Sequence, residues 1–261
     1  MAFSNDPSIV AVAELLDQAR ANIRGIDPPA VLTALSLAQA YDVQDTLVAR
    51  RSAGGAGQSG WKLGITSPVK QRIMGIANPL FGRTFADGEY SGEARVRYAT
   101  LIAPRTEPEL AFGLSSPIDD SMDRDALMNA IAWIAPALEI TDSRYRSGTR
   151  TAVELVADNT SAGAYVIGPR VDPRTAPAID SFATELVRNG VVVASGSTAD
   201  VLGNPVNALA ALAVHLASRG LRTRSGDIVL SGAITDAVPV ADGDVVEARL
   251  AGLGIATVTF F

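Results

Sequence analysis

The first fifty residues carry apolar side chains at the spacing of one helical face. These positions are Ile9, Val12, Leu16, Ala19 and Ile23. Asp6 is a suitable N-cap and a proline follows it, so the pattern predicts a helix that starts here and ends at Gly25. A second helix is predicted from Ser36, which can form a capping box with Gln39, to about Arg51.

The stretch 52–60, SAGGAGQSG, interrupts this pattern with small residues. Such a composition is typical of a flexible connection between structural units. We therefore expect a small N-terminal helical lobe over residues 1–55 and a main domain over residues 56–261.

Most of the remaining chain alternates apolar and polar residues over short segments, as half-buried strands do. The predicted strands are 61–66, 106–112, 136–142, 227–232, 245–252 and 255–261, with a hairpin over 185–195 that turns at Asn189-Gly190. Helices are predicted over 68–74, 123–135 and 204–220. Because strands and helices do not alternate strictly, these elements predict an α+β fold with a strand-rich main domain.

The composition narrows the classes of function. The 261 residues carry a formal net charge of −6 without a basic cluster, so we expect no binding to nucleic acid or to a membrane. The chain has no cysteine, no recognisable signal peptide and no apolar run of membrane-spanning length, which fits a cytoplasmic protein. His215 is the only histidine, and we interpret it as a boundary residue of a helix. Chemistry must therefore rest on carboxylates, lysine, arginine and hydroxyls.

Glu107 and Glu109 lie two residues apart on a predicted strand, so both carboxylates point to one face. Leu110 and Phe112 take the opposite face, as core residues do. Two adjacent like charges are unfavourable unless a cation, a shared proton or solvent separates them. The pattern alone is also compatible with two solvated glutamates on an outer sheet face.

Glu139 favours a bound cation as the explanation for the Glu107–Glu109 pair. It is the lone charge in the apolar run AWIAPALEI, where an unpaired buried carboxylate would be costly. A metal ion shared with Glu107 and Glu109 would satisfy all three. Three carboxylates without histidine or cysteine describe a hard oxygen site, which predicts Mg²⁺ or Mn²⁺ and not Zn²⁺.

Two further segments carry candidate polar residues. Lys62 occupies the non-core face of its predicted strand, where it is either a solvent-facing lysine or a cation for a substrate carboxylate or enolate. The segment ADNTSAG (157–163) places small polar residues just before a strand, which is usual turn chemistry.

Seven collinear segments resemble the 2-oxopent-4-enoate (vinylpyruvate) hydratase and 4-oxalocrotonate decarboxylase family, which shares the fumarylacetoacetate-hydrolase fold. The segments are WKLGITS (61–67), MGIANPLFG (74–82), EPELAF (107–112), PALEITDSRY (136–145), VADNTSAG (156–163), LGNPVNALAALA (202–213) and SGDIVLSG (225–232). Each is weak alone, and their common order over residues 40–261 carries the assignment.

The resemblance implies a site and an assembly. It implies that magnesium is held by Glu107, Glu109 and Glu139, and that Lys62 is the catalytic residue. The substrate, a small 2-oxo acid, is expected to contact Ser161, Leu80 and Thr66. The implied fold is a mixed β roll after an N-terminal helical lobe, assembled as a homo-oligomer, with a companion hydratase or decarboxylase as a candidate partner.

Leu80 bears on which lyase reaction is expected. Hydratases of the family resemble P-D-[FY]-G where this chain has PLFG (79–82), and an apolar side chain cannot activate water. The segments DSRY and 234–244 also resemble decarboxylases, whereas Phe112 resembles hydratases and Thr160 departs from both. We predict decarboxylation of 2-oxo-3-hexenedioate (4-oxalocrotonate) to 2-hydroxypenta-2,4-dienoate in aromatic meta-cleavage catabolism. The alternative is hydration of that dienoate to 4-hydroxy-2-oxopentanoate.

Two other classes of function stay open. A hydrolase of the wider fold family would cleave a 1,3-diketone acid, but it needs a base that activates water, and His215 is badly placed for this role. A non-catalytic partner subunit would use the fold only for assembly. The presence of Lys62 together with the three glutamates argues against that second class.

Overall fold

The computed structural model describes residues 6–146 and 150–261. Its α-helices are α1 (Pro7–Ala21), α2 (Leu37–Ala53), α3 (Pro68–Met74), α4 (Arg124–Asn129), α5 (Ala152–Ala157) and α6 (Val206–Ser218). Short 3₁₀ turns are η1 (Ala30–Ala34), η2 (Ala86–Gly88), η3 (Tyr98–Thr100), η4 (Asn159–Ser161) and η5 (Thr198–Asp200). None of the helices in the described ranges is long and apolar enough to cross a membrane.

Within the described residues the strands form an eight-stranded sheet and a five-stranded sheet. The first follows the order β2 (Leu80–Phe85), β1 (Gln58–Gly64), β10 (Ile228–Leu230), β5 (Pro104–Leu114), β6 (Ile131–Asp142), β7 (Ala162–Ile167) and β3 (Glu89–Ser91), with β11 (Val238–Pro239) paired to β5. The second follows the order β4 (Glu93–Val96), β13 (Gly254–Phe260), β12 (Val245–Leu250), β8 (Ala183–Arg188) and β9 (Val191–Ser197).

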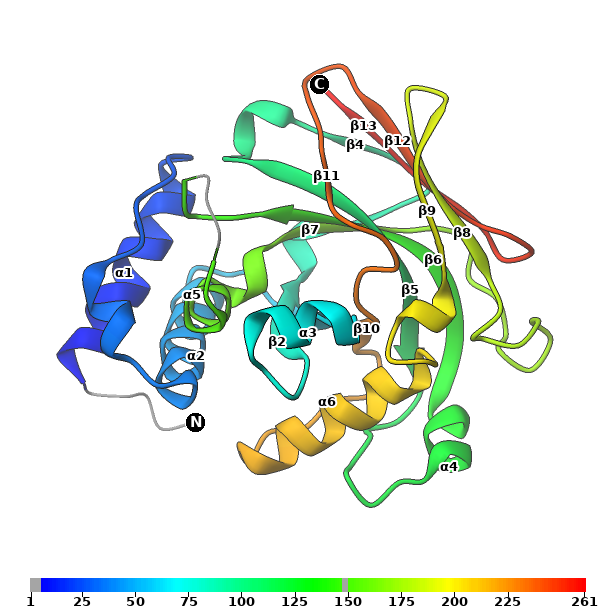
Figure 1. The fold of residues 1–261 in the computed structure, drawn as a ribbon, viewed down its shortest axis with the longest axis horizontal. Coiled ribbons are helices and arrows are strands. Elements are labelled where there is room, and N and C mark those ends of the chain that lie inside the picture. Colours follow the sequence, from blue (N-terminus) through cyan, green and yellow to red (C-terminus); the bar gives the residue numbers. More distant parts are fainter. Residues whose placement is uncertain (1–5, 147–149) are drawn as a thin grey trace.

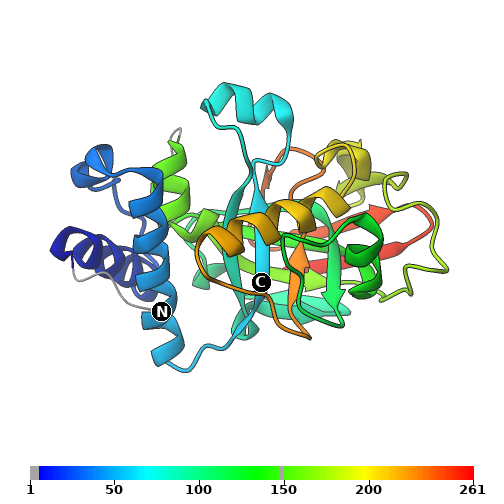
Figure 2. The same cartoon turned by 90° about the horizontal axis from the view of Figure 1, so that it is seen from below.

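Helices at the N-terminus precede a curled sheet, as the sequence predicts for an α+β fold. Figure 1 shows α1, α2 and α5 gathered at one side of the strands, and Figure 2 shows α6 lying along the sheet. The buried Gln44 connects α2 to β2 and α5, because its side-chain amide donates to the carbonyl oxygens of Phe81 on β2 and Val156 on α5.

Local signals account for the first two helices. The Asp6 side chain accepts a hydrogen bond from the Ser8 amide and caps α1. Ser36 and Gln39 form the predicted capping box at the start of α2. The first helix ends at Ala21, before the predicted Gly25, with Asn22 as its C-cap.

Two predicted boundaries are wrong. The helix predicted over 123–135 ends at Asn129, and strand β6 begins at Ile131. Ile131 and Ile134 fit a helical spacing, but both belong to a strand that is buried over most of its length. The flexible connection predicted over 52–60 is also too long, because residues 58–60 already pair in β1.

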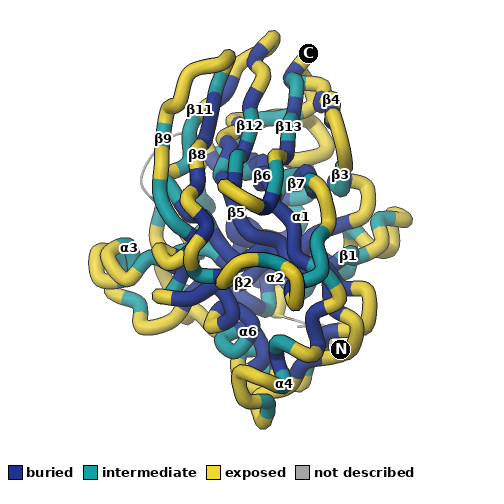
Figure 3. Tube along the Cα trace, turned by 90° about the vertical axis from the view of Figure 1, so that its right-hand side faces the viewer, coloured by how far each residue is buried: buried dark blue, intermediate teal, exposed yellow. Residues whose placement is uncertain are grey.

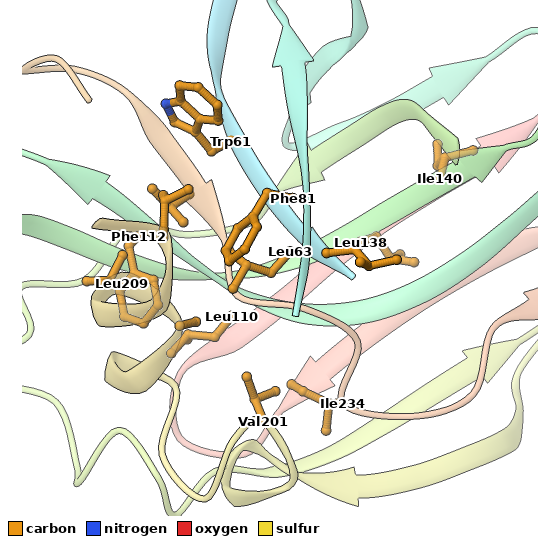
Figure 4. Close-up of a cluster of buried hydrophobic side chains, with 14 of the residues drawn as sticks. Trp61, Leu63, Phe81, Leu110, Phe112, Leu138, Ile140, Val201, Leu209 and Ile234 are labelled. Atoms are coloured by element: carbon orange, nitrogen blue, oxygen red, sulfur yellow. The ribbon is translucent and has the colours of Figure 1, made fainter. Parts of the chain in front are cut away.

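The main core lies between the eight-stranded sheet, the five-stranded sheet and α6. Leu110 and Phe112 on β5 and Leu138 and Ile140 on β6 all belong to it and are fully buried. Figure 4 shows these side chains packed with others from β1, β2 and α6. Side chains alternate along each strand, so these four residues point into the core, and the glutamates of β5 and β6 point to the opposite face. The tube in Figure 3 shows the resulting buried centre under exposed loops.

Candidate active site

The three glutamates converge on one face of the eight-stranded sheet. Glu107 on β5 pairs directly with Glu139 on β6, and Glu109 lies two residues further along β5 on the same face. One carboxylate oxygen from each lies within 4.8 Å of the others. Glu109 and Glu139 are buried, and Glu107 is partly buried. A pair of solvated glutamates on an outer face is therefore the wrong interpretation of the Glu-x-Glu pattern.

This cluster is electrically unbalanced. Glu109 Oε1 and Glu139 Oε2 are buried without a hydrogen-bond partner among the described residues. Burial, and next the charge of Glu139, raises the pKa of Glu109 well above its ordinary value. Burial also raises the pKa of Glu139 to about 7, although the nearby Lys62 ammonium opposes the shift. The raised pKa values and unsatisfied oxygens show that the single Lys62 ammonium does not compensate the charge of these carboxylates, so further positive charge would stabilise the cluster.

The donor set fits a divalent cation. Three carboxylates and the ammonium of Lys62 leave a formal excess of two negative charges, which one divalent ion would neutralise. All the donor atoms are hard carboxylate oxygens, which suit Mg²⁺ or Mn²⁺. The residues present therefore fit a magnesium site.

Lys62 lies inside the protein beside this cluster. Its Nζ is 2.8 Å from Glu139 Oε1 and donates to the carbonyl oxygen of Thr160 at 2.9 Å. Burial alone would lower the pKa of Lys62, but the charge of Glu139 and then that of Glu107 outweigh burial, so the pKa is raised. The residue is only 2% exposed, so a solvent-facing lysine is excluded.

The sheet must curl to bring Lys62 and Glu139 together. Strands β10 and β5 separate β1 from β6. In a flat sheet the backbones of β1 and β6 would lie about 14 Å apart, at the usual spacing between neighbouring strands. Curling toward this face closes that gap and places the lysine over the carboxylates.

A strained turn forms another wall of the site. Asn159, Thr160 and Ser161 have φ values of 50°, 49° and 57°, a left-handed backbone that costs about 1–3 kcal/mol at each non-glycine residue. The Asn159 side chain holds the turn by donating to the Arg83 carbonyl oxygen and accepting from the Arg83 amide. The turn packs so closely on β2 that a Cβ at Gly82 would lie 2.2 Å from Thr160 Oγ1.

A buried ion pair under the turn was not predicted from the sequence. The guanidinium of Arg144 donates to Asp158 Oδ1, to the backbone oxygen of Asp158 and to the carbonyl of Ala162. Asp158 Oδ2 in turn accepts from Ser161 Oγ at 3.3 Å. These contacts fix the segment that presents Ser161, and no local pattern around residue 144 indicates them.

Glu109 is anchored by the segment that follows β10. The amide of Gly232 donates to Glu109 Oε2 at 2.7 Å. Gly232 has a φ of +104°, and a Cβ here would lie 2.4 Å from Thr66 Cγ2. Only glycine therefore allows this backbone to approach both the carboxylate and Thr66.

A cavity of about 160 Å³ opens beside the cluster. The predicted residues Lys62, Thr66, Leu80, Glu107 and Ser161 all line it. Its remaining lining residues are Gly64, Ile65, Ser67, Lys70, Thr141, Leu155, Thr160 and Ala233. Among these described residues Glu107 is the only carboxylate. The size and lining suit a small acid and not a coenzyme.

The pairing of β1 with β2 explains why Leu80 lines the cavity on the same side as Lys62. Lys62 pairs with Gly82, and Gly64 pairs with Leu80. Directly paired residues of antiparallel strands present their side chains on the same face, so Leu80 shares the face of Lys62. Leu80 is 1% exposed and makes this part of the cavity apolar.

Comparisons with known proteins found similar sequences over nearly the whole chain. The family model described as fumarylacetoacetate (FAA) hydrolase C-terminal matches residues 90–260. The chain is 36% identical to a TodF product hydratase of Pseudomonas putida over 95% of this chain and 93% of the relative. It is 30% identical to a 4-oxalocrotonate decarboxylase of a Pseudomonas species over 94% and 95% of the two chains.

A solved structure has nearly the same fold. The 4-oxalocrotonate decarboxylase from Pseudomonas putida G7, complexed with magnesium and adipate, superposes with a TM-score of 0.93. Its sequence is 30% identical, and the match covers 99% of both chains.

Proposed function

Since this chain belongs to the fumarylacetoacetate hydrolase family, we propose that it is a magnesium-dependent lyase that decarboxylates 2-oxo-3-hexenedioate to 2-hydroxypenta-2,4-dienoate. The assignment to the lyases is common to its decarboxylase and hydratase relatives. The choice of decarboxylation rests on the lining of the cavity.

The observation that carries this choice is the apolar wall at Leu80. Hydration needs a base within hydrogen-bond reach of a water molecule at the far end of the substrate. Glu107 is the only carboxylate among the described residues of the cavity, and we assign it to the metal. Leu80 and Leu155 offer no proton acceptor, so the lining from the described parts of the chain provides no second base for water.

We assign the metal to Glu107, Glu109 and Glu139, because these carboxylates converge and two of their oxygens are unsatisfied. When bound there, Mg²⁺ supplies Lewis-acid stabilisation of negative charge on the 2-oxo group of the substrate. The same oxygen donors would also accept Mn²⁺.

The reaction shifts electron pairs from the leaving carboxylate along the conjugated chain to the C2 oxygen. The bond between C5 and the C6 carboxylate breaks, and its electrons form a double bond between C4 and C5. The former double bond between C3 and C4 shifts to C2 and C3, and the C2 oxygen takes the negative charge and then a proton. Carbon dioxide leaves, and the dienol is the other product.

Lys62 is the residue we assign to that developing oxygen charge. It lines the cavity, and its raised pKa keeps the ammonium protonated. A fixed positive charge in a buried site stabilises an oxyanion without reorganising solvent. Thr66 and Ser161 line the same cavity and offer hydroxyls that orient the substrate.

Hydration of 2-hydroxypenta-2,4-dienoate is the second candidate. The observation in its favour is that the hydratase relative is 36% identical and the decarboxylase relative 30%. Both reactions use the same enolate chemistry, so the cluster itself does not separate them. The difference lies at the far end of the substrate, where Leu80 favours the decarboxylase.

Three broader assignments are part of the proposal. We place the enzyme in the cytoplasm, where a chain without cysteine is at no disadvantage. We divide the chain near residue 55, between the N-terminal helices and β1. We also expect a homo-oligomer, because edge strand β9 exposes Val191, Val192 and Val193.

A side-by-side ultraviolet assay tests the proposed reaction. Purified protein receives either 2-oxo-3-hexenedioate or 2-hydroxypenta-2,4-dienoate, each with Mg²⁺ and with a chelator. We expect Mg²⁺-dependent formation of the dienoate from the dicarboxylate and slow consumption of added dienoate. Rapid hydration of the dienoate without turnover of the dicarboxylate would establish the second candidate instead.

A further inference from the structure

The cavity carries a second cation that the reaction described above does not use. Lys62 lies at its buried end and is 2% exposed. Lys70, on helix α3, also lines the cavity, and its side chain is 37% exposed. We propose that Lys70 binds the second carboxylate of the substrate and so selects dicarboxylic 2-oxo acids over monocarboxylic acids of the same length. This inference rests on the proposed function.

The order of residues along β1 and α3 supports this placement. From Lys62 the chain runs through Gly64 and Thr66 to the start of α3, and all three residues line the cavity. Leu80 pairs with Gly64, and Lys62 pairs with Gly82. These two pairs are two residues apart, so Leu80 lies about 7 Å from the position of Lys62 along the strand direction. Lys70 lies beyond these two pairs. The cavity thus runs from the carboxylate cluster past an apolar wall to a cation.

A six-carbon dicarboxylate has the same sequence of groups. Its 2-oxo acid end matches the metal cluster and Lys62, its middle carbons match Leu80, and its second carboxylate matches Lys70. A monocarboxylate of the same length would leave Lys70 without a substrate partner. The charge pattern of the cavity therefore distinguishes the two classes.

Lys70 is held at the cavity by a partner that a ligand can replace. Its Nζ is 2.8 Å from Asp236 Oδ1, and the Asp236 side chain is 87% exposed. Exposed ion pairs of this kind contribute little net stability. Asp236 belongs to the segment after β10, which also supplies Ala233 to the cavity lining. Figure 1 shows this segment beside α3, and Figure 2 shows α3 projecting from the body of the molecule.

The expected contribution of Lys70 is to binding and not to the chemical step. Decarboxylation converts the second carboxylate to neutral CO₂, so a cation beside it stabilises the bound substrate more than the transition state. Loss of such an interaction raises KM and does not lower kcat. This separates the role of Lys70 from that of Lys62.

Two unreactive ligands test the inference directly. 2-Oxoadipate has the six carbons and both carboxylates of the substrate but no double bond, so it cannot lose CO₂ by the route above. 2-Oxohexanoate has the same length and one carboxylate. Calorimetric titration of each into the Mg²⁺-loaded protein compares the wild type with Lys70→Met, Lys70→Arg and Arg72→Met. Arg72 is an exposed cation of the same helix and does not line the cavity.

We expect the wild type to bind 2-oxoadipate more tightly than 2-oxohexanoate. Lys70→Met should weaken 2-oxoadipate binding by roughly fivefold to tenfold, the effect of one charge-assisted contact at a partly exposed site, and leave 2-oxohexanoate unchanged. Lys70→Arg should retain the preference and Arg72→Met should not alter it. Equal weakening of both ligands, no weakening of either, or the same loss in Arg72→Met would overturn the inference.

This design separates failure of the inference from failure of the proposed function. Binding of the two saturated ligands does not depend on turnover. A protein that decarboxylates 2-oxo-3-hexenedioate but shows no Lys70-dependent preference refutes the role of Lys70 alone. A protein that shows the preference but releases no CO₂ refutes the reaction and retains a dicarboxylate site.

Discussion

Lys62 on β1 and Glu139 on β6 form an ion pair in the interior, with Nζ 2.8 Å from Oε1 and side chains 3% and 2% exposed. The pair joins strands that are separated by two others in the sheet. It also brings a permanent positive charge next to the carboxylates we assign to the metal. The arrangement predicts that both residues are needed for turnover, for different reasons.

Lys62→Met should lower kcat by on the order of a hundredfold or more, because it removes a charge that stabilises the developing oxyanion. Steady-state kinetics with 2-oxo-3-hexenedioate at saturating Mg²⁺ measures the effect, and circular dichroism checks the fold. A variant with normal kcat and only a raised KM would show that Lys62 merely binds the substrate.

Gly82→Ala should damage the turn over residues 159–161, because the new Cβ would lie 2.2 Å from Thr160 Oγ1 and 2.8 Å from the Asn159 carbonyl oxygen. We expect a loss of about 1–3 kcal/mol in the free energy of unfolding, together with a fall in kcat. Denaturant unfolding and kinetics measure the two effects.

Gly57→Ala is the matched control for this substitution. A Cβ at Gly57 meets no atom within 4 Å, and its backbone is not left-handed. The control should keep its activity and its stability within about 0.5 kcal/mol of the wild type. Equal stability of both variants would contradict the close packing of β2 on the turn.

Leu80→Asp should abolish decarboxylation, because it places a charged and hydrated group in the apolar part of the cavity. Some hydratase activity is expected to appear, since the new carboxylate can accept a proton from water. Leu80→Asn is the comparison, because it is polar but is not a base. It should lose decarboxylation without gaining hydration.

Melting curves of both Leu80 variants separate chemistry from folding. Leu80 is 1% exposed and is also part of the core. Variants that retain a cooperative transition report on the reaction. If both variants melt normally and still release CO₂ at the wild-type rate, Leu80 has no part in the choice of reaction.

His215 should make the fold sensitive to acid. It stacks on Phe81 and lies against Tyr41, with ring centroids 4.3 and 4.5 Å away. Burial, and next the charge of Arg219, lowers its pKa from 6.5 to about 4. Below about pH 6.5 the unfolded chain therefore binds a proton at His215 that the folded protein does not bind. The stability that the neutral, buried His215 contributes is thus lost as the pH falls from 6.5 toward 4.

The melting temperature of wild type and His215→Gln as a function of pH measures this effect. Between pH 7 and 5 we expect the melting temperature of the wild type to fall more than that of the variant. The difference between the two melting temperatures should therefore become smaller. Other titrating groups are common to both proteins and cancel in the comparison. Parallel pH profiles would contradict the lowered pKa.

The sequence predicts those parts of the site that follow from local periodicity. Residues two apart on a strand share a face, so Glu107 and Glu109 could be paired from spacing alone. The lone charge of Glu139 in an apolar run predicted that it needed a partner, and the structure places it directly opposite Glu107. The pattern left two roles open for Lys62, and the family resemblance added the expectation that it is catalytic.

Contacts between distant segments were beyond such reasoning. The bond between Lys62 and the Thr160 carbonyl depends on how the sheet curls, and the Arg144–Asp158 pair depends on a turn held from another strand. The first part of strand β6, residues 131–135, fits a helix by its sequence, because Ile131 and Ile134 lie three residues apart and show no period-two pattern. Tertiary packing decides each of these features.

The most direct test of the account is CO₂ release from 2-oxo-3-hexenedioate during a Mg²⁺ titration of the wild type and Glu139→Gln. Glu185→Gln is the control, because Glu185 is an exposed residue of β8 outside the cavity. We predict saturable, Mg²⁺-dependent release from the wild type and the control. Glu139→Gln should fold but release no CO₂ at any Mg²⁺ concentration, because the metal loses one of its three carboxylates. Release that persists in chelator, or that is unchanged in Glu139→Gln, would contradict the account.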